Sequence, residues 1–171
     1  LPIYQYNYFL DPITPIEKSD TLKAGTPIVT FAMEQLREPY CNIIFIGQNG
    51  GFNDVSELIR QIKAMVSYSR SKRFIVVSFH KPNNVLPSVS RMIEMEDSLA
   101  TAFGNHFVNL RHYMCNNGMR DAGLEPTPID KDSIAHGQVP PSLMKDGLHF
   151  TADAHRLIAT LLHYKMVELG Y

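Results

Sequence analysis

The sequence predicts an α/β domain in which a parallel sheet is covered by helices on both faces. Three short apolar runs, at 42–46, 74–79 and 106–110, have the length and composition of strands that are buried on both faces. Segments with helical features follow these runs, and an alternation of strands and helices is typical of a parallel sheet. The connections are too long for hairpins and long enough for right-handed βαβ crossovers.

The helices are predicted from the spacing of apolar residues and from capping signals. Asn53 or Asp54 is a suitable N-cap for a first helix. Its apolar residues recur at three- and four-residue spacing: Val55, Leu58, Ile59, Ile62, Met65 and Val66. A second helix is expected around 90–103. A last helix is expected from Ala152, capped by Thr151 and ended by Gly170.

Proline and glycine mark the other segments. Residues 3–10 alternate tyrosines with polar side chains, which predicts a half-exposed strand, and a short helix is expected at 28–36. Residues 118–141 are expected to be a long connector rich in Pro, Gly and Asp. We expect a single domain over 1–171, in which 1–30 form a strand and a Pro-rich lead-in.

Composition excludes several classes of function. The chain carries 16 Lys and Arg against 17 Asp and Glu, a formal net charge of −1. Because phosphate neutralisation needs a clustered basic excess, no nucleic-acid partner is expected. No apolar run approaches about 18 residues, so a membrane-spanning helix is not expected either. Cys41 and Cys115 define no disulfide framework, and whether they pair is left open.

The first candidate site is the glycine-rich loop Gly47–Gly51, which directly follows the apolar run 42–46. In open parallel sheets, ligands bind at the carboxyl ends of the strands. Glycines let a ligand approach the backbone closely, and Asn49 can direct its side-chain N–H at a developing negative charge, as an oxyanion hole requires. The alternative is a strand-to-helix turn in which Asn49 only forms the turn. A phosphate loop is disfavoured, because neither common glycine motif fits.

The second candidate site is Asp146-Gly147-Leu148-His149, just before the last expected helix. A carboxylate three residues before an imidazole can accept the proton of Nδ1, fix the tautomer and leave Nε2 as a general base. The alternatives are that Asp146 caps the helix and that His149 is an ordinary surface residue. The other six histidines show no metal-ligand spacing, so no metal is expected.

Together, the two sites resemble the SGNH (GDSL-type) hydrolase family. In that family the third block is Gly-x-Asn-Asp and the fifth is Asp-x-x-His; here the matching segments are Gly47-Gln48-Asn49-Gly50 and Asp146-Gly147-Leu148-His149. The resemblance extends from Phe31 to the C-terminus. It implies a three-layer, flavodoxin-like α/β/α fold that is incomplete at its N-terminus, and an enzyme without a cofactor.

The resemblance also implies a role for each residue. His149 would be the general base, Asp146 its orienting carboxylate, and Asn49 a donor in the oxyanion hole. Gly25 would be the glycine of the second block, and Gly47 is the glycine of the third. Both would contribute backbone to the oxyanion hole.

A second match to the third block leaves one assignment open. Gly51-Phe52-Asn53-Asp54 fits Gly-x-Asn-Asp literally, whereas Gly50 replaces the usual Asp after Asn49. We favour Asn49 as the oxyanion donor, because it lies at the end of the expected strand and because Asn53 and Asp54 are expected to cap the helix.

The nucleophile of the family is absent from this sequence. Gly-Asp-Ser, the first block, occurs nowhere in 1–171, and Ser78 lies in the context of an ordinary sheet strand. The chain begins at Leu1 without an initiator Met or a targeting signal, so we expect it to be the C-terminal portion of a longer polypeptide whose upstream segment carries the serine. The chain alone is then expected to lack esterase activity.

The expected substrate is a small-acyl ester on carbohydrate, which makes the favoured class a carbohydrate O-acetylesterase. No strongly apolar lid helix is evident, and the tyrosines of 3–10 could stack on sugar rings or simply pack an edge strand. The competing hypothesis is a non-catalytic glycan-binding module on the same scaffold. A phosphoryl-handling flavodoxin-like domain would need an acidic cluster or a phosphate loop, and the sequence has neither.

Overall fold

The computed structural model describes residues 37–81 and 88–171. The chain divides into two units, Leu1–Thr30 and Phe31–Tyr171, and every described residue lies in the second. The strand expected at 3–10, the helix expected at 28–36 and the candidate Gly25 lie outside the described residues.

The sheet of the described residues consists of three short parallel strands. In spatial order they are β1 (Asn42–Ile44), β2 (Phe74–Val77) and β3 (Phe107–Val108). Ile43 is paired with Ile75, and Val77 with Val108. The parallel sheet and the alternation of strands with helices confirm the α/β class that the sequence predicts.

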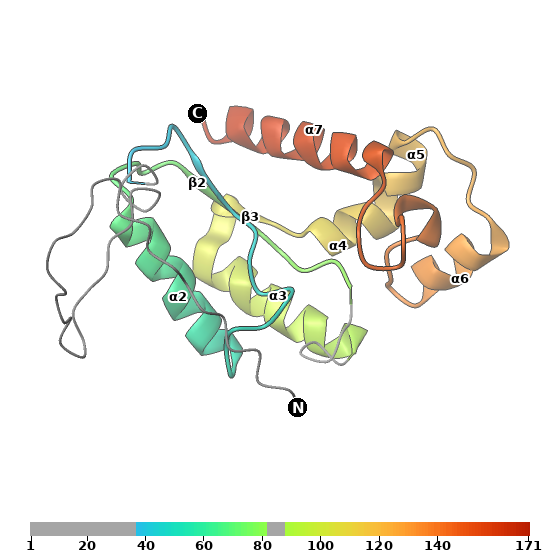
Figure 1. Cartoon of the computed structure of the whole chain (residues 1–171), viewed down its shortest axis with the longest axis horizontal. Coiled ribbons are helices and arrows are strands. Elements are labelled where there is room, and N and C mark those ends of the chain that lie inside the picture. The colour runs from blue at the N-terminus through green and yellow to red at the C-terminus, as the bar shows by residue number, and fades with distance from the viewer. Residues whose placement is uncertain (1–36, 82–87) are drawn as a thin grey trace, which may run out of the picture. The chain divides into compact units, whose positions relative to one another are not determined.

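Helices cover both faces of this sheet. On one face lie α2 (Val55–Tyr68) and α3 (Val89–Phe103), and on the other lies α7 (Ala152–Glu168), as Figure 1 shows. Because side chains of a strand alternate between its faces, β2 contributes to both cores. Val76 packs with residues of α2 and α3, whereas Ile75 and Val77 pack with residues of α7. The described residues thus form helix, sheet and helix layers.

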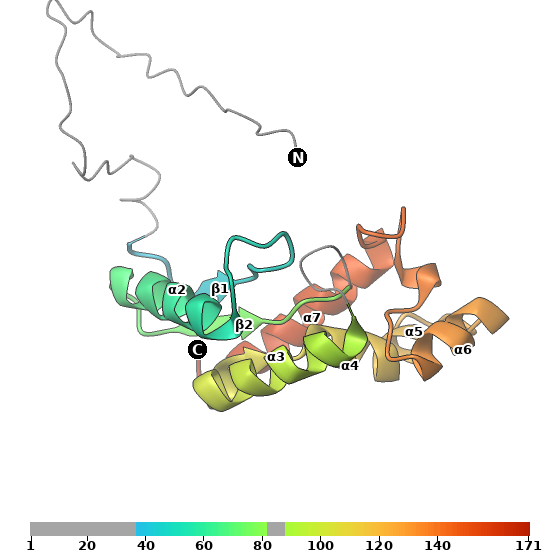
Figure 2. The ribbon, with the colours of Figure 1, turned by 90° about the horizontal axis from the view of Figure 1, so that it is seen from below.

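The first strand, β1, lies at an edge of the sheet. Among the described residues it pairs only with β2. Figure 2 shows β1 beside α2, and a hollow of about 660 Å³ lies against the two, lined by Asn42–Ile46 together with Ala64, Met65 and Tyr68. Ile43 and Phe45 are 49% and 40% exposed there. Within 37–81 and 88–171, this edge is therefore apolar and unpaired.

Capping side chains explain where the long helices begin. Of the two candidate caps for α2, Asp54 is the N-cap, and its Oδ1 accepts the backbone N–H of Glu57 at 2.8 Å. Ser88 caps α3, and Thr151 caps α7 as expected. No described helix has both the length and the apolar composition needed to cross a membrane.

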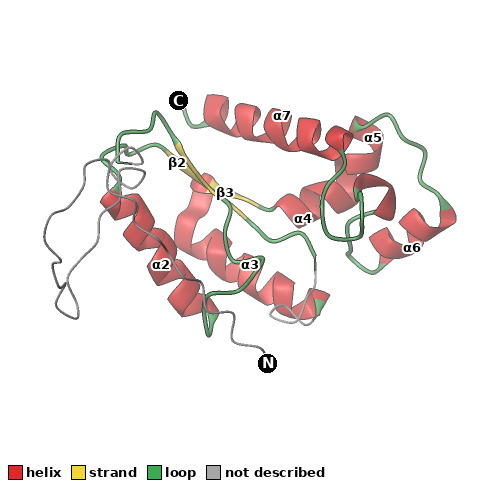
Figure 3. Cartoon of the chain, in the orientation of Figure 1, coloured by secondary structure: helices red, strands yellow, loops and turns green. Residues whose placement is uncertain are grey.

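The remaining elements are short, and Figure 3 shows them as a series of helical turns joined by loops. The strand expected at 106–110 is only two residues long, because Asn109 accepts the backbone N–H of His112 and so starts a helix. In chain order the short elements are η1 (Gly104–His106), α4 (Leu110–Tyr113), the π-helical η2 (Met114–Gly118), α5 (Met119–Asp121) and η3 (Pro141–Leu143).

The connector expected at 118–141 contains a helix that sequence analysis missed, α6 (Pro128–Ala135). Thr127 and Asp130 form a capping box, and Pro128 occupies the first turn. Asp130 is fully buried and also accepts hydrogen bonds from the backbone N–H and the hydroxyl of Ser142, at 2.9 and 2.7 Å. This carboxylate therefore joins the start of α6 to η3, just ahead of the second candidate site.

Candidate functional site

The second candidate site lies at the tip of a tight loop between η3 and α7. Met144 and Phe150 form an isolated antiparallel bridge, and the backbone N–H of Lys145 donates to the carbonyl of His149 at 2.7 Å. Gly147, at the tip, has a φ of 76°, a left-handed conformation that glycine adopts without strain. The loop therefore returns on itself and brings Asp146 next to His149.

The Asp146 carboxylate and the His149 imidazole are hydrogen-bonded. Nδ1 of His149 lies 2.8 Å from Oδ2 and 3.0 Å from Oδ1 of Asp146. A carboxylate can only accept, so Nδ1 carries the proton. Nε2 makes no hydrogen bond to any described residue, and the His149 side chain is 70% exposed. The geometry is that of an oriented imidazole with a free basic nitrogen.

Further donors hold the Asp146 carboxylate in its charged form. Its Oδ1 accepts the backbone N–H groups of His149 and Leu148, at 2.9 and 3.1 Å. The backbone N–H of His149, together with its ring and the N–H of Leu148, holds the pKa of Asp146 well below its usual range. Asp146 does not cap the last helix, because Thr151 has that role.

The first candidate site is a turn at the end of β1. Gly47 is buried with a φ of 96°, and a Cβ there would lie 2.9 Å from the ring of Phe79. A side chain is therefore excluded at this position by packing as well as by conformation. Asn49 is exposed, and its amide makes no hydrogen bond to a described residue, whereas Nδ2 of Asn53 donates to Glu57 at 2.7 Å.

Both candidate loops are hydrogen-bonded to the same segment, His80-Lys81, which follows β2. Oε1 of Gln48 accepts the backbone N–H of His80 at 3.0 Å, and Nε2 of Gln48 donates to the carbonyl of Lys81 at 2.8 Å. From the other side, Nε2 of His80 donates to the carbonyl of Leu148 at 2.9 Å, and the Lys81 ammonium donates to the carbonyl of Gly147. The carboxyl end of the sheet therefore connects the two loops.

Sequence reasoning missed both connecting side chains, Gln48 and His80. Gln48 lies inside the glycine-rich loop that the sequence marks as a candidate site, and His80 directly follows the apolar run 74–79. No local pattern marks either as a contact residue, since their partners are 33 and 68 residues away in the sequence.

The described residues offer no activated nucleophile. Ser78 is fully buried; its hydroxyl accepts the backbone N–H of Leu110 at 2.8 Å and donates to the carbonyl of Phe79 at 3.1 Å. Cys41 and Cys115 are both free thiols, and burial raises the pKa of Cys115 to about 11, which keeps it neutral. No group of three or more His, Cys, Asp or Glu side chains in the described part of the chain is placed to hold a metal ion.

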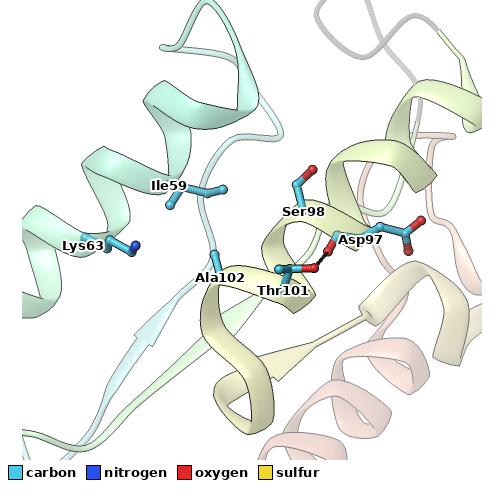
Figure 4. A pocket seen from close by; sticks show the side chains of 6 residues that line it. All are labelled: Ile59, Lys63, Asp97, Ser98, Thr101 and Ala102. Carbon is cyan, nitrogen blue, oxygen red and sulfur yellow. Dashed lines mark hydrogen bonds between the residues drawn. The ribbon is translucent and has the colours of Figure 1, made fainter.

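A separate groove of about 470 Å³ lies between α2 and α3 (Figure 4), lined by Ile59, Lys63, Asp97, Ser98, Thr101 and Ala102. Its hydroxyls are used within their own helix: Thr101 donates to the carbonyl of Asp97, and Ser98 to the carbonyl of Glu94, each at 2.9 Å. The hydroxyl groups of this groove are therefore occupied within α3, and none of its lining residues is a histidine held by a carboxylate.

The arrangement at the end of the sheet can accept a proton at Nε2 of His149 and can offer an amide donor at Asn49. It has no attacking group of its own among the described residues. Comparisons with models of known protein families, with curated proteins and with solved structures gave no match.

Proposed function

We propose that this chain supplies the base and the oxyanion donor of an SGNH-type serine esterase that removes small acyl groups from carbohydrate. The observation that carries this proposal is the hydrogen-bonded Asp146–His149 pair, with Nε2 of His149 free and exposed. An imidazole oriented in this way by a carboxylate is the general base of Ser-His-Asp catalysis.

In the proposed mechanism the serine comes from a segment outside residues 1–171. Nε2 of His149 takes the proton of the serine hydroxyl as its oxygen attacks the acyl carbonyl. Asn49 donates to the oxyanion that forms, and the protonated His149 returns the proton to the leaving sugar oxygen. His149 then deprotonates a water molecule that attacks the acyl-serine. The imidazolium returns this proton to the serine oxygen as the acyl–oxygen bond breaks, which releases the carboxylic acid and regenerates both the serine and the base. Asp146 stabilises the imidazolium in both steps.

The open edge of β1 supports this proposal by offering a place for the serine-bearing segment. A further parallel strand paired with β1 would end near the Gly47–Gly51 loop, because parallel strands end at the same edge of a sheet. Ile43 and Phe45 would be covered by such a strand and by what packs on it. We therefore propose that this upstream strand completes the sheet and gives it the flavodoxin-like form of the SGNH family.

Activity of a longer polypeptide tests the proposal. With the upstream segment included, we expect hydrolysis of 4-nitrophenyl acetate and labelling of a serine by a fluorophosphonate. His149→Ala should lower kcat by about 10⁴-fold or more, because the residual rate then depends on the oxyanion donors alone. His163→Ala, which removes an exposed imidazole of α7, is the matched control and should leave kcat unchanged.

The missing nucleophile favours one other function, a non-catalytic glycan-binding module. A longer polypeptide that binds acetylated oligosaccharides but shows neither turnover nor fluorophosphonate labelling would favour this module. Residues 1–171 alone are expected to be inactive. If residues 1–171 alone hydrolysed the ester and His149→Ala abolished this turnover, the proposal that the serine lies outside 1–171 would be refuted.

A further inference from the structure

His80 lies between the two candidate loops and contacts both. It follows β2 directly, is 8% exposed, and its ring packs on Phe150 with centroids 4.6 Å apart and edge-on to Phe45 at 6.1 Å. Phe45 lies just before the glycine-rich loop, and Phe150 directly follows His149. The backbone N–H of His80 is held by Gln48 at 3.0 Å. The imidazole thus packs between two aromatic rings, and Gln48 holds the backbone of the same residue.

The hydrogen bond of His80 defines its tautomer. Its Nε2 lies 2.9 Å from the carbonyl oxygen of Leu148, and a carbonyl oxygen can only accept, so Nε2 carries the proton. Its Nδ1 is buried and has no hydrogen-bond partner among the described residues. A second proton on Nδ1 would therefore be a buried donor without an acceptor, which is costly. The neutral ring fits this position, and the charged ring does not.

The hydrogen bond from His80 acts on the peptide unit next to the proposed base. The carbonyl of Leu148 and the N–H of His149 belong to one planar peptide unit. His80 donates to the oxygen of this unit, and the nitrogen of the unit donates to Oδ1 of Asp146 at 2.9 Å. Two side chains, one from the segment after β2 and one from the loop itself, therefore bind opposite edges of the peptide unit next to His149.

We infer that His80 is a positioning residue, whose neutral Nε2–H holds the Leu148–His149 peptide so that His149 keeps its hydrogen bond to Asp146. This inference rests on the proposed function, since the orientation of His149 matters for catalysis only if His149 is the base. Burial lowers the pKa of His80, the hydrogen bond to Leu148 opposes this, and the nearby Lys81 and His149 lower it further, so the ring is neutral at pH 7.

The inference is tested by NMR on residues 1–171, which needs no esterase activity. His80→Phe keeps a ring against Phe45 and Phe150 but removes the donor. At about pH 8.5, where imidazoles are neutral, we expect His149 to change from a single Nδ1–H tautomer to a mixture. The backbone amide of His149 should exchange about tenfold faster or more, while amides of β2 keep their protection.

Two further variants make this test specific. His80→Gln replaces the ring with an amide donor of similar reach and should restore the single tautomer and the slow exchange. His106→Phe is the matched control: its ring nitrogen lies 3.0 Å from the carbonyl of Phe74 at the other end of β2, and its loss should leave His149 unchanged. If His80→Phe fails to fold, His80→Met fills the same space without a donor.

An unchanged tautomer and exchange rate in a folded variant without the donor would overturn the inference. It would also be overturned if His80→Gln lost the single tautomer as completely as His80→Phe. In the longer polypeptide, His80→Phe should lower kcat about tenfold to a hundredfold with little change in KM, and His80→Gln should recover it. If the native longer polypeptide shows no turnover while the NMR changes occur, the proposed function fails and the positioning of His149 by His80 stands.

Discussion

Asp146 is an exposed carboxylate that receives three N–H donors, two from the backbone and one from an imidazole. This concentration of donors is local, because all of them come from Leu148 and His149. The four-residue turn Asp146–His149 therefore pairs the carboxylate with the imidazole through its own hydrogen bonds, and the local pattern Asp-x-x-His predicts this pairing.

The depressed pKa of Asp146 gives this turn a defined pH dependence. Because the pKa is lower in the folded chain, the carboxylate stabilises the turn above the unfolded value of about 3.9, and this contribution is lost as the pH falls through the folded pKa. We expect the amide signals of Leu148 and His149 to stay native down to about pH 3, as measured by NMR. A transition of these signals centred near pH 4 would contradict the donor arrangement. Asp146→Ala should remove the single Nδ1–H tautomer of His149 at about pH 8.5, where imidazoles are neutral.

Asp130 is the second carboxylate with a clear pH signature, and it is buried. Burial raises its pKa, but the hydrogen bonds from Thr127 and Ser142 outweigh burial and lower the pKa to about 2. Its stabilising effect should be complete above about pH 4 and decline as the pH falls toward 2. Asp130→Ala should lower the free energy of unfolding by about 2 kcal/mol at pH 7, because several buried donors lose their acceptor. Urea unfolding measures this, with the exposed Asp132→Ala as a control that should change little.

At the scale of elements, a buried ion pair joins α3, α4 and the loop that follows α6. Nη2 and Nε of Arg111 lie 2.5 and 2.8 Å from the carboxylate of Glu96, and Nη1 donates to the carbonyl of Gly137 at 2.7 Å. Both side chains are almost completely buried. The pair therefore fixes the packing of elements that precede the loop carrying the candidate base.

Breaking this pair from one side should be costly. Arg111→Met leaves the Glu96 charge buried without a counter-charge, with only the amide of Asn109 still donating to it, and we expect the free energy of unfolding to fall by about 3–5 kcal/mol in urea titrations. The double variant Glu96→Met and Arg111→Met should be less damaging than the sum of the single changes. The exposed pair Arg91–Glu94 is the control, and Arg91→Ala should cost less than about 1 kcal/mol. Equal costs for the two arginines would contradict this account.

The elements that the sequence predicts are those with local signals. The start of α2 at Val55 and that of α7 at Ala152 follow from a capping side chain one residue earlier. The signal for α6 is also local, in Thr127-Pro128-Ile129-Asp130, but proline and aspartate are equally common in loops, and the sequence analysis therefore predicts a connector there. The contacts of Gln48 and His80 were not predictable, because each joins residues that only the sheet brings together.

At the scale of the whole molecule, the open edge of β1 is the feature with the largest consequence for behaviour in solution. An exposed apolar strand edge is a template for pairing with another chain. Unless it is covered, we expect residues 1–171 to associate as their concentration rises, as measured by sedimentation velocity.

Ile43→Lys should reduce this association, because lysine on an edge strand opposes pairing. Ile129→Lys is the matched control: Ile129 is 68% exposed on α6, and its change should leave association as it is. Equal effects of the two substitutions would show that general solubility, and not the β1 edge, controls the association.

The central strand β2 has a further consequence, for the way the molecule comes apart. Ile75 and Val77 belong to one core, while Val76 belongs to the other, so neither core is complete without this strand. Heat or denaturant that unfolds one helix layer exposes β2, and the other core then loses the strand on which it packs. The two layers should consequently unfold in a single cooperative step.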